Sequence, residues 1–356
     1  MSTSGKTKHN LLKKTFGFLT PLVLMIVFLY VAFKDTDFEK VFNIITHLSV
    51  LWLLAFIVAW FFSHLVRAYR WRIIINSVKP KTSILNLLGA IFVGYGVNCV
   101  VPRLGELYRP LFLGRWENIS RSSMVGTIIV ERVLDILILG ISVLVSVIIY
   151  PGNLFAEFNW LKSAIVLGFG GIFAIILFIF LLVRFRENFY NVIVAWASKI
   201  SKGLSDKLAH IFHLLIDGFS SIKTVKSFVM IICLSVIMML LYGLTSYIGF
   251  LMLKMDGIQP VTYGMAWILM TISAFGVIIP TPGATGSYHL ITISVLVGLF
   301  HFDHEISSAF AIMTHLITYV LFIFTSLSFS FVINKKQASK GLDTVGFINA
   351  FKMREI

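Results

Sequence analysis

One short segment carries two arginines and a glutamate spaced three residues apart, Arg103, Glu106 and Arg109. If this segment is helical, Glu106 lies beside both arginines, which are then about a third of a turn apart. Arginine stays charged in a low dielectric and donates two parallel hydrogen bonds to a phosphate or a carboxylate. A helix that starts near Pro102 also points its free N–H groups at an anion. The segment therefore predicts an anion site, with an ordinary ion-pair cluster as the alternative.

A second charged group follows within an apolar run, as Glu131, Arg132 and Asp135. The two carboxylates are one helical turn apart on one face, so Arg132 can pair with Asp135 or, across the bundle, with Glu106. Ionisable groups at bilayer depth are costly and usually face protein or a water-filled cavity. They indicate either a cavity wall or a structural lock between helices.

A third group surrounds the turn from Pro280 to Ser287, which interrupts another apolar run. A half-helix starting there would have Thr281, Thr285 or Ser287 as its cap, and its N-terminus would also attract an anion. His289 follows this turn and is of the type that titrates between about pH 5 and 8. The alternative for His289 is a hydrogen-bonded packing residue.

The composition places these groups in a membrane protein. The 356 residues are 58% hydrophobic and 13% charged, with a mean hydropathy of +0.92, against ~45–50% and ~25% for soluble domains. The net charge of +14 comes from Lys and Arg in short loops between apolar runs, which indicates topology and contact with anionic lipid rather than nucleic acid. Cys99 and Cys233 lie within apolar runs and form no metal or disulfide motif.

Six apolar runs are long enough to cross a hydrocarbon core of ~30 Å. The first follows a basic start, but it is too long for the apolar part of a signal peptide, so we expect it to remain uncleaved. The predicted spans are Phe16 to Phe33, Val50 to Val66, Met124 to Tyr150, Ser163 to Val183, Lys226 to Leu253 and Ser307 to Ile333.

Two further apolar regions, Ile84 to Val101 and Val261 to Phe300, do not fit a single crossing. The first has basic segments on both sides, which the positive-inside rule places in the cytoplasm. The second lies in a long stretch whose only Lys or Arg is Lys254, so both its ends belong outside. We therefore predict two opposed re-entrant hairpins, with breaks near Asn98 to Pro102 and at the Pro280 to Ser287 turn.

The expected architecture is an all-α polytopic integral membrane protein of about six full spans plus two re-entrant hairpins, at about 84–121 and 261–300. An inverted repeat fits this topology, and eight to nine simple spans are the alternative. Residues 1–333 form one transmembrane domain, 184–225 a cytoplasmic amphipathic segment and 334–356 a cytoplasmic basic tail. Both termini are predicted to be cytoplasmic.

A basic segment with a tryptophan follows the second predicted span. This pattern is typical of a belt at the cytoplasmic membrane interface, with no role in a site. The segment contains Arg67, Arg70, Trp71 and Arg72.

The order and spacing of the three polar groups resemble those of a known family of membrane proteins. The motifs Asn98-x-x-x-Pro102-Arg103-x-Gly105-Glu106-x-x-Arg109, Glu131-Arg132-x-x-Asp135 and Pro280-x-Pro282-Gly283-x-x-Gly286 resemble the lysylphosphatidylglycerol synthase transmembrane-region family. The resemblance covers roughly Val50 to Ile333 and implies a multi-pass protein of the bacterial inner membrane that moves lipids between leaflets. His289 replaces the family's acidic residue and Ala284 its second glycine. The sequence ends at Ile356 without an aminoacyl-transferase domain, so we expect no lipid aminoacylation.

The leading hypothesis is translocation of a phosphate-bearing lipid, a phospholipid or a prenyl phosphate, through a polar groove between the hairpins. No cofactor or metal is expected, no nucleic acid is expected as a partner, and a homo-oligomer is compatible with the sequence. The predicted substrate-binding residues are Asn98, Arg103, Glu106, Arg109, Glu131, Arg132, Asp135, Pro282, Gly283, Gly286 and His289.

Two alternatives remain open. A membrane-embedded transferase acting on a lipid-linked substrate would need a metal-binding carboxylate pair, for which Glu131 and Asp135 are the candidates. An accessory protein would tether a separate lipid or glycan synthase through the basic segment 184–225.

Overall fold

A computed structural model describes residues 19–76, 78–119, 121–184, 198–199, 201–203, 205 and 224–350. Within these residues the chain consists of α-helices and short 3-10 turns, without strands. In the described part of the chain, four helices are long and apolar enough to cross a membrane, or five if a bent pair near its start counts as one span. The four are α3 (Val50–Ile75), α6 (Arg121–Ile149), α11 (Val225–Met252) and α14 (His304–Ala338). The expected all-α polytopic membrane fold is confirmed.

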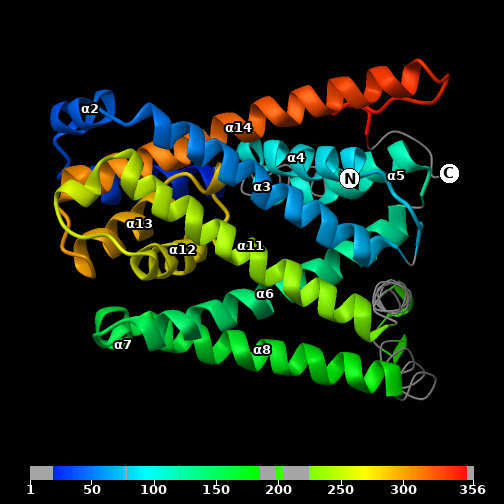
Figure 1. Cartoon of the computed structure of the whole chain (residues 1–356). Coiled ribbons are helices and arrows are strands. Elements are labelled where there is room, and N and C mark those ends of the chain that lie inside the picture. The colour runs from blue at the N-terminus through cyan, green and yellow to red at the C-terminus, as the bar shows by residue number, and fades with distance from the viewer. Residues whose placement is uncertain are drawn as a thin grey trace, which may run out of the picture. The chain divides into compact units, whose positions relative to one another are not determined.

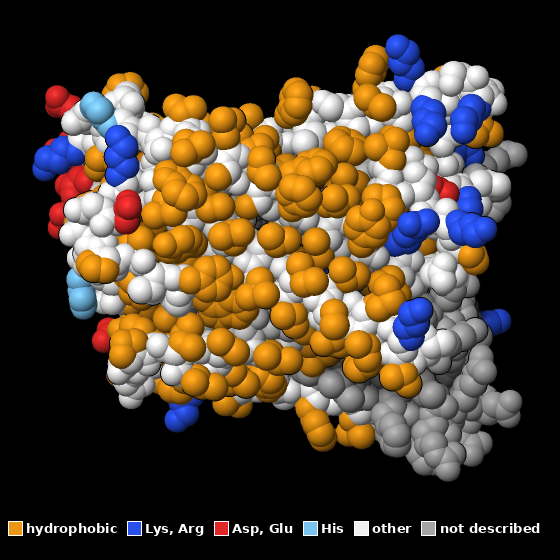
Figure 2. Space-filling model, viewed as in Figure 1, with side chains coloured by type: hydrophobic (Ala, Val, Ile, Leu, Met, Phe, Trp, Pro, Cys, Tyr) orange, Lys and Arg blue, Asp and Glu red, His pale blue; other side chains and the backbone are white. Residues whose placement is uncertain are grey.

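The surface of these helices is suited to lipid. Large apolar side chains point outward along them, for example Leu54, Val236 and Phe324. Figure 2 shows hydrophobic side chains over most of the face in view, with few charged side chains among them. Such a surface would drive association in water, whereas in a bilayer each helix satisfies its own backbone and exposes apolar side chains at no cost.

Two spans continue well beyond their predicted C-terminal ends. Helix α3 continues past Val66 to Ile75, and α14 continues past Ile333 to Ala338, so α14 is roughly 52 Å long at 1.5 Å per residue. The predicted span from Ser163 to Val183 lies within α8 (Asn159–Arg184). Because α3 continues as a helix, its basic end belongs to the bundle and not to a loop.

The predicted first span is described from Leu19 onward and ends at Phe33. It is followed by α2 (Phe38–Thr46), whose axis is bent by 87° from it. The carboxylate of Asp37 caps α2 by accepting hydrogen bonds from the backbone N–H groups of Glu39 and Lys40.

The chain divides into two compact units. Four helices are divided between the units, with one part in unit 1 and the other in unit 2: α3, α4 (Ile84–Val100), α11 and α14. Unit 1 comprises the chain up to Trp60, with Phe92–Gly105 and Tyr242–Ser328. Unit 2 comprises Phe61–Ile91, Glu106–Leu241 and Phe329–Ile356.

Unit 1 contains a helical hairpin of α12 (Tyr263–Ile278), the 3-10 turn η2 (Pro282–Ala284) and α13 (Ser287–Gly298). Figure 1 shows α12 and α13 side by side. The Ser287 hydroxyl donates to the carbonyl oxygen of Gly276 over 2.7 Å, which ties the start of α13 to the end of α12. The predicted helix–break–helix pattern is confirmed here, and entry from the outer face stays a prediction.

The other predicted break lies between α4 and α5 (Gly105–Glu117). Residues 101–104 form the turn, so α5 starts at Gly105 and not near Pro102 as predicted. Re-entry from the cytoplasm and the inverted repeat stay predictions.

In unit 2, α6 is followed by the short α7 (Leu154–Glu157) and by α8, which packs against α6 (Figure 1). The segment 339–350, predicted as part of a separate basic tail, packs against the end of α14. The side chain of Asn334 accepts from the backbone N–H of Val345 and donates to its carbonyl oxygen. The predicted amphipathic segment 184–225 lies almost entirely outside the described residues.

Candidate functional site

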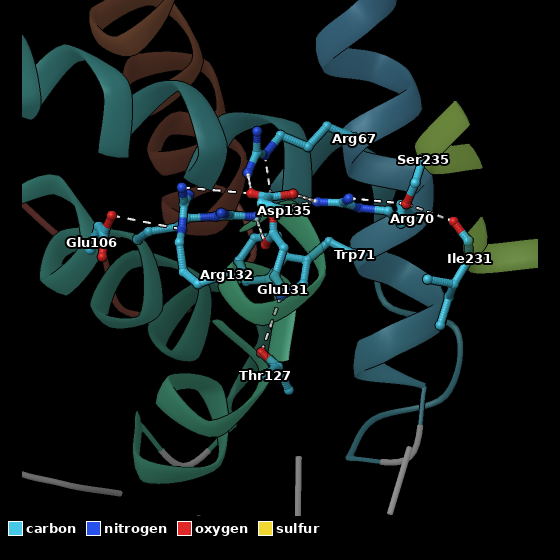
Figure 3. Close-up of polar contacts among 11 residues, drawn as sticks. Arg67, Arg70, Trp71, Glu106, Thr127, Glu131, Arg132, Asp135, Ile231 and Ser235 are labelled. Atoms are coloured by element: carbon cyan, nitrogen blue, oxygen red, sulfur yellow. Dashed lines mark hydrogen bonds and ion pairs between the residues drawn. The ribbon is translucent and has the colours of Figure 1, made fainter. Parts of the chain in front are cut away.

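Seven charged side chains from three helices meet in unit 2 (Figure 3). Helices α3, α5 and α6 each supply at least two of them, although the motifs lie far apart in the sequence. We call this group the arginine cluster. Its members are Arg67, Arg70, Glu106, Arg109, Glu131, Arg132 and Asp135.

Glu131 is the centre of the arginine cluster and has no exposed surface. One carboxylate oxygen, Oε1, accepts from Nε of Arg67 at 2.8 Å and from Nη2 of Arg70 at 3.4 Å. The other oxygen, Oε2, lies 2.7 Å from Nη2 of Arg109. Because a buried carboxylate is costly without partners, these three cations are what allow it to stay ionised.

Asp135 lies one turn further along α6 and shares partners with Glu131. Arg67 and Arg70 each donate to one of its oxygens, and Nη1 of Arg132 lies 3.6 Å from it. The predicted placement of both carboxylates on one helical face is confirmed. The spacing of three residues between Arg67 and Arg70 likewise places both guanidinium groups on one face of α3.

The remaining contacts fix the arginine side chains in place. The guanidinium carbon of Arg109 lies 3.8 Å from the ring centroid of Trp71, a cation–π contact. The indole N–H of Trp71 donates to the hydroxyl of Thr127 at 3.1 Å. Arg70 Nη1 donates to the hydroxyl of Ser235 on α11 at 3.1 Å (Figure 3). The buried arginines are therefore pre-organised by their neighbours.

The arginine cluster is open at one edge. Arg132 and Glu106 face each other with 3.7 Å between Nε and Oε1, and their side chains are 36% and 43% exposed. The side chains of Arg67, Arg70, Arg109 and Glu131 are at most 5% exposed. A ligand would therefore meet Arg132 and Glu106 first.

The arginine cluster carries a positive surplus, with four arginines against three carboxylates. Several of its buried donors, among them Nε of Arg70 and Nε of Arg109, have no hydrogen-bond acceptor among the described residues. Nη2 of Arg109 and Oε2 of Glu131 form an ion pair at 2.7 Å without the geometry of a hydrogen bond. A buried donor without an acceptor costs ~1–3 kcal/mol, more when it belongs to a charged group. An anion or water would satisfy these donors, and an anion would also balance the charge.

Sequence reasoning singled out five of the seven cluster residues and missed two of them, Arg67 and Arg70, together with the neighbouring Trp71. Arg132 contacts both of its predicted partners, Asp135 and Glu106. The prediction of an interfacial belt was wrong for Arg67, Arg70 and Trp71, which are buried. Their spacing was the available signal, because positions i, i+3 and i+4 lie on one face of a helix. Arg67 and Arg70 are members of the arginine cluster and Trp71 packs against it, which sequence reasoning did not foresee.

Arg103 lies in unit 1 and is not on the same helix as Glu106. Its φ of 62° is in the left-handed region, in the turn before α5, so the predicted helical spacing with Glu106 and Arg109 is wrong. Its Nη2 donates to the carbonyl oxygen of Ile278 at 2.6 Å, at the last residue of α12. An arginine there satisfies an end carbonyl and complements the negative end of the helix dipole.

The α4–α5 break in unit 1 is stabilised by two neighbouring contacts. The side-chain oxygen of Asn98 accepts from the N–H of Gly105 at 2.7 Å, so the first amide of α5 is already bound. A Cβ at Gly105 would lie 1.8 Å from the carbonyl oxygen of Gly94, so only glycine allows this approach. Asn98 therefore acts as a cap in this structure, and its predicted role as a substrate ligand is untested.

The α12–α13 turn lies against the α4–α5 break within unit 1. The hydroxyl of Tyr319 donates to the carbonyl oxygen of Cys99 at 2.8 Å. A Cβ on Gly283, whose φ is 56°, would lie 3.3 Å from the Cα of Cys99. These contacts place the α12–α13 turn beside the end of α4, where the α4–α5 break begins.

The residues around the α12–α13 turn cap it, form hydrogen bonds within it or are buried in it. Gly286, with a φ of 89°, is the N-cap of α13, and its N–H donates to Nδ1 of His289 at 3.3 Å. The prediction of a hydroxyl cap was wrong, because Thr281 contacts the Ser287 hydroxyl instead. Pro282 is buried at the start of η2. Substrate binding by the turn residues stays a prediction.

An all-α membrane fold, two broken helical hairpins and a buried arginine cluster define a polytopic membrane protein with a buried polar site. The family model of the lysylphosphatidylglycerol synthase TM region matches residues 18–325. The chain therefore belongs to the lysylphosphatidylglycerol synthase TM-region family, which confirms the resemblance seen in the motifs. No curated protein and no solved structure matches the chain. The family membership indicates a function related to membrane lipids.

Proposed function

We propose that this protein translocates a phosphate-bearing lipid between the leaflets of the bacterial inner membrane. The observation that carries the proposal is the positive surplus of the arginine cluster, together with its buried donors that lack an acceptor. A lipid headgroup phosphate supplies negative charge and oxygen acceptors at once, while the acyl or prenyl chain stays in the bilayer. Membership in a lipid-related membrane family supports the same substrate class.

The open edge suggests how the headgroup is bound. Glu106 holds Arg132 across 3.7 Å when no ligand is present, and both side chains are accessible. A phosphate displaces Glu106 from Arg132, because a guanidinium binds a phosphate through two parallel hydrogen bonds. The buried arginines behind this edge supply long-range attraction without having to move.

In the proposed binding mode, the individual arginines have different roles toward the phosphate. Arg109 contributes from the buried side, since its side chain is 5% exposed and rests on Trp71. Arg103 is exposed, but its guanidinium is bound to the end of α12. Arg132 is therefore the proposed first contact of the phosphate.

The transferase alternative loses its best candidate pair. Glu131 and Asp135 are both bound by arginines, which compete directly with a divalent cation for the same oxygens. A metal site there would leave Arg67 and Arg70 buried beside a second set of positive charges. The tether alternative concerns segment 184–225, almost all of which lies outside the described residues.

The proposal is tested with purified protein in liposomes that contain a fluorescent phosphatidylglycerol in both leaflets and an external quencher. Translocation carries quenching past the half-way plateau of protein-free liposomes. We expect this extra quenching to be lost in Arg132→Gln and retained in Lys40→Gln, whose ion pairs with Asp37 and Glu305 are on the surface. Equal quenching by the wild type and Arg132→Gln would contradict the proposed role of the arginine cluster.

A further inference from the structure

Two buried imidazoles meet at the α12–α13 turn, and the arginine cluster does not use them. His289 is in the first turn of α13 and His315 is on α14, with 4.6 Å between their ring centroids. His289 Nδ1 is bound by the N–H of Gly286, and His315 Nε2 lies 2.9 Å from the carbonyl oxygen of Gly283. The two side chains therefore hold two residues of one turn.

These backbone contacts fix the tautomer of each neutral imidazole. An N–H group only donates, so His289 Nδ1 carries a lone pair and its hydrogen is on Nε2. A carbonyl oxygen only accepts, so His315 carries its hydrogen on Nε2. The lone pair that no backbone contact uses is on Nδ1 of His315.

This difference determines where a proton would bind. A proton on His289 Nδ1 would face the N–H of Gly286 and break the contact that caps α13. A proton on His315 Nδ1 displaces no backbone contact, so the cost of binding it there is the burial of a charge. His315 Nδ1 is therefore the better acceptor.

The surroundings contain no counter-ion for that charge among the described contacts of the pair. The titratable groups against His315 are the phenols of Tyr288 and Tyr319, each 5.7 Å away between ring centroids. Cys99 accepts a hydrogen bond from Tyr319, and the first helix contributes the ring of Phe33 against His289. Phenols and thiols ionise only above about pH 8. A protonated pair would therefore favour an arrangement in which water reaches it.

The turn is the element that can rearrange. Gly283, Ala284 and Gly286 all have positive φ values, of 56°, 61° and 89°, and for Ala284 this conformation is strained. We infer that His289 and His315 form a proton-binding site, with Nδ1 of His315 as the acceptor, and that binding of one proton releases the α12–α13 turn.

Under the proposed function, on which this consequence rests, the released turn would couple lipid movement to a proton. Gly283 of the α12–α13 turn packs against Cys99 at the end of α4, and Arg103 in the α4–α5 break donates to Ile278 at the end of α12. Release of the turn would therefore loosen the contact between the two breaks. Proton binding itself does not depend on transport and is measured separately.

The test uses the full chain in nanodiscs with ¹⁵N-labelled histidine, titrated from pH 8 to pH 4. Nitrogen chemical shifts report which ring nitrogen takes the proton, and His315→Gln assigns the signal. Hydrogen exchange of the peptide that contains Gly286 is followed in parallel and corrected for the intrinsic pH dependence. We expect protonation at His315 Nδ1. The corrected hydrogen-exchange rate of the Gly286 peptide should rise about tenfold for each unit by which the pH falls, as an opening that binds one proton requires.

The control variants separate this site from general effects of acid. Glutamine at position 315 places an amide nitrogen near the position of Nε2, so it keeps the donor to Gly283 but binds no proton. Its exchange should show no such rise, whereas His301→Asn, in an exposed loop, should behave as the wild type. A neutral His315 down to pH 4, or the same rise in exchange in His315→Gln, would overturn the inference. Neither readout uses lipid transport, so a failure of the proposed function leaves the result interpretable.

Discussion

Replacing Glu131 with glutamine tests whether the arginine cluster is held together by its central carboxylate. The substitution keeps the shape of the side chain but removes the negative charge that three buried arginines share. The arginine surplus would then rise from one to two charges in a largely buried site. Removing one partner of a buried ion pair costs about 3–5 kcal/mol, because the remaining charges are left unpaired.

The matched control is Glu106→Gln, at the exposed edge of the same cluster. Its ion pair with Arg132 is 3.7 Å long and both side chains are more than a third exposed, so the expected cost is about 0–1 kcal/mol. Both variants lose one carboxylate, so they differ only in burial and in the number of partners. The free energy of unfolding is measured by reversible titration with sodium dodecyl sulfate in mixed micelles.

A double variant tests whether charge imbalance causes the loss of stability in Glu131→Gln. Glu131→Gln combined with Arg109→Gln restores the original charge balance, so it should be less destabilised than the sum of the two single variants. If Glu131→Gln unfolds at the same detergent fraction as Glu106→Gln, the buried network does not stabilise unit 2 as described. Strict additivity in the double variant would refute the charge-balance argument.

Three further predictions address other contacts. Gly105→Ala should prevent stable folding, because the added methyl would lie 1.8 Å from a backbone carbonyl oxygen, whereas Gly168→Ala, with open space around it, should raise or leave unchanged the thermal midpoint. Trp71→Leu should lower the free energy of unfolding by about 1–3 kcal/mol in the same detergent titration, through lost cation–π and hydrogen-bond contacts. Asn334→Ala should speed hydrogen exchange in segment 339–350, and unchanged exchange there would contradict its anchoring role.

The features that depend on neighbouring residues in the chain were predicted correctly from the sequence. Gly, Asn and Pro residues in an apolar run predicted both helix breaks, and the one-turn spacing of Glu131 and Asp135 predicted their common face. Apolar length predicted the spans, although α3 and α14 continue beyond the apolar stretch as helices. The reason is that helix formation does not end where hydrophobicity ends.

The errors arose where long-range contacts override a local rule. The positive-inside rule assigned Arg67 and Arg70 to a loop, but carboxylates more than 60 residues away in the chain allow them to be buried. Helical spacing joined Arg103 to Glu106, but the left-handed backbone at Arg103 breaks the register that this argument needs. In both cases the deciding partner, α6 or the end of α12, cannot be read from the local sequence.

The central claim is that the arginine cluster binds the lipid phosphate through Arg132. Its most direct test is isothermal titration calorimetry of the purified protein with a short-chain phosphatidylglycerol and with the matching diacylglycerol, which lacks the phosphate. We predict binding of the phosphatidylglycerol only, weakened about 10–100-fold in Arg132→Gln, as expected for a lost hydrogen bond to a charged group, and unchanged in Lys40→Gln. Equal affinity for both lipids, or unchanged affinity in Arg132→Gln, would contradict the claim.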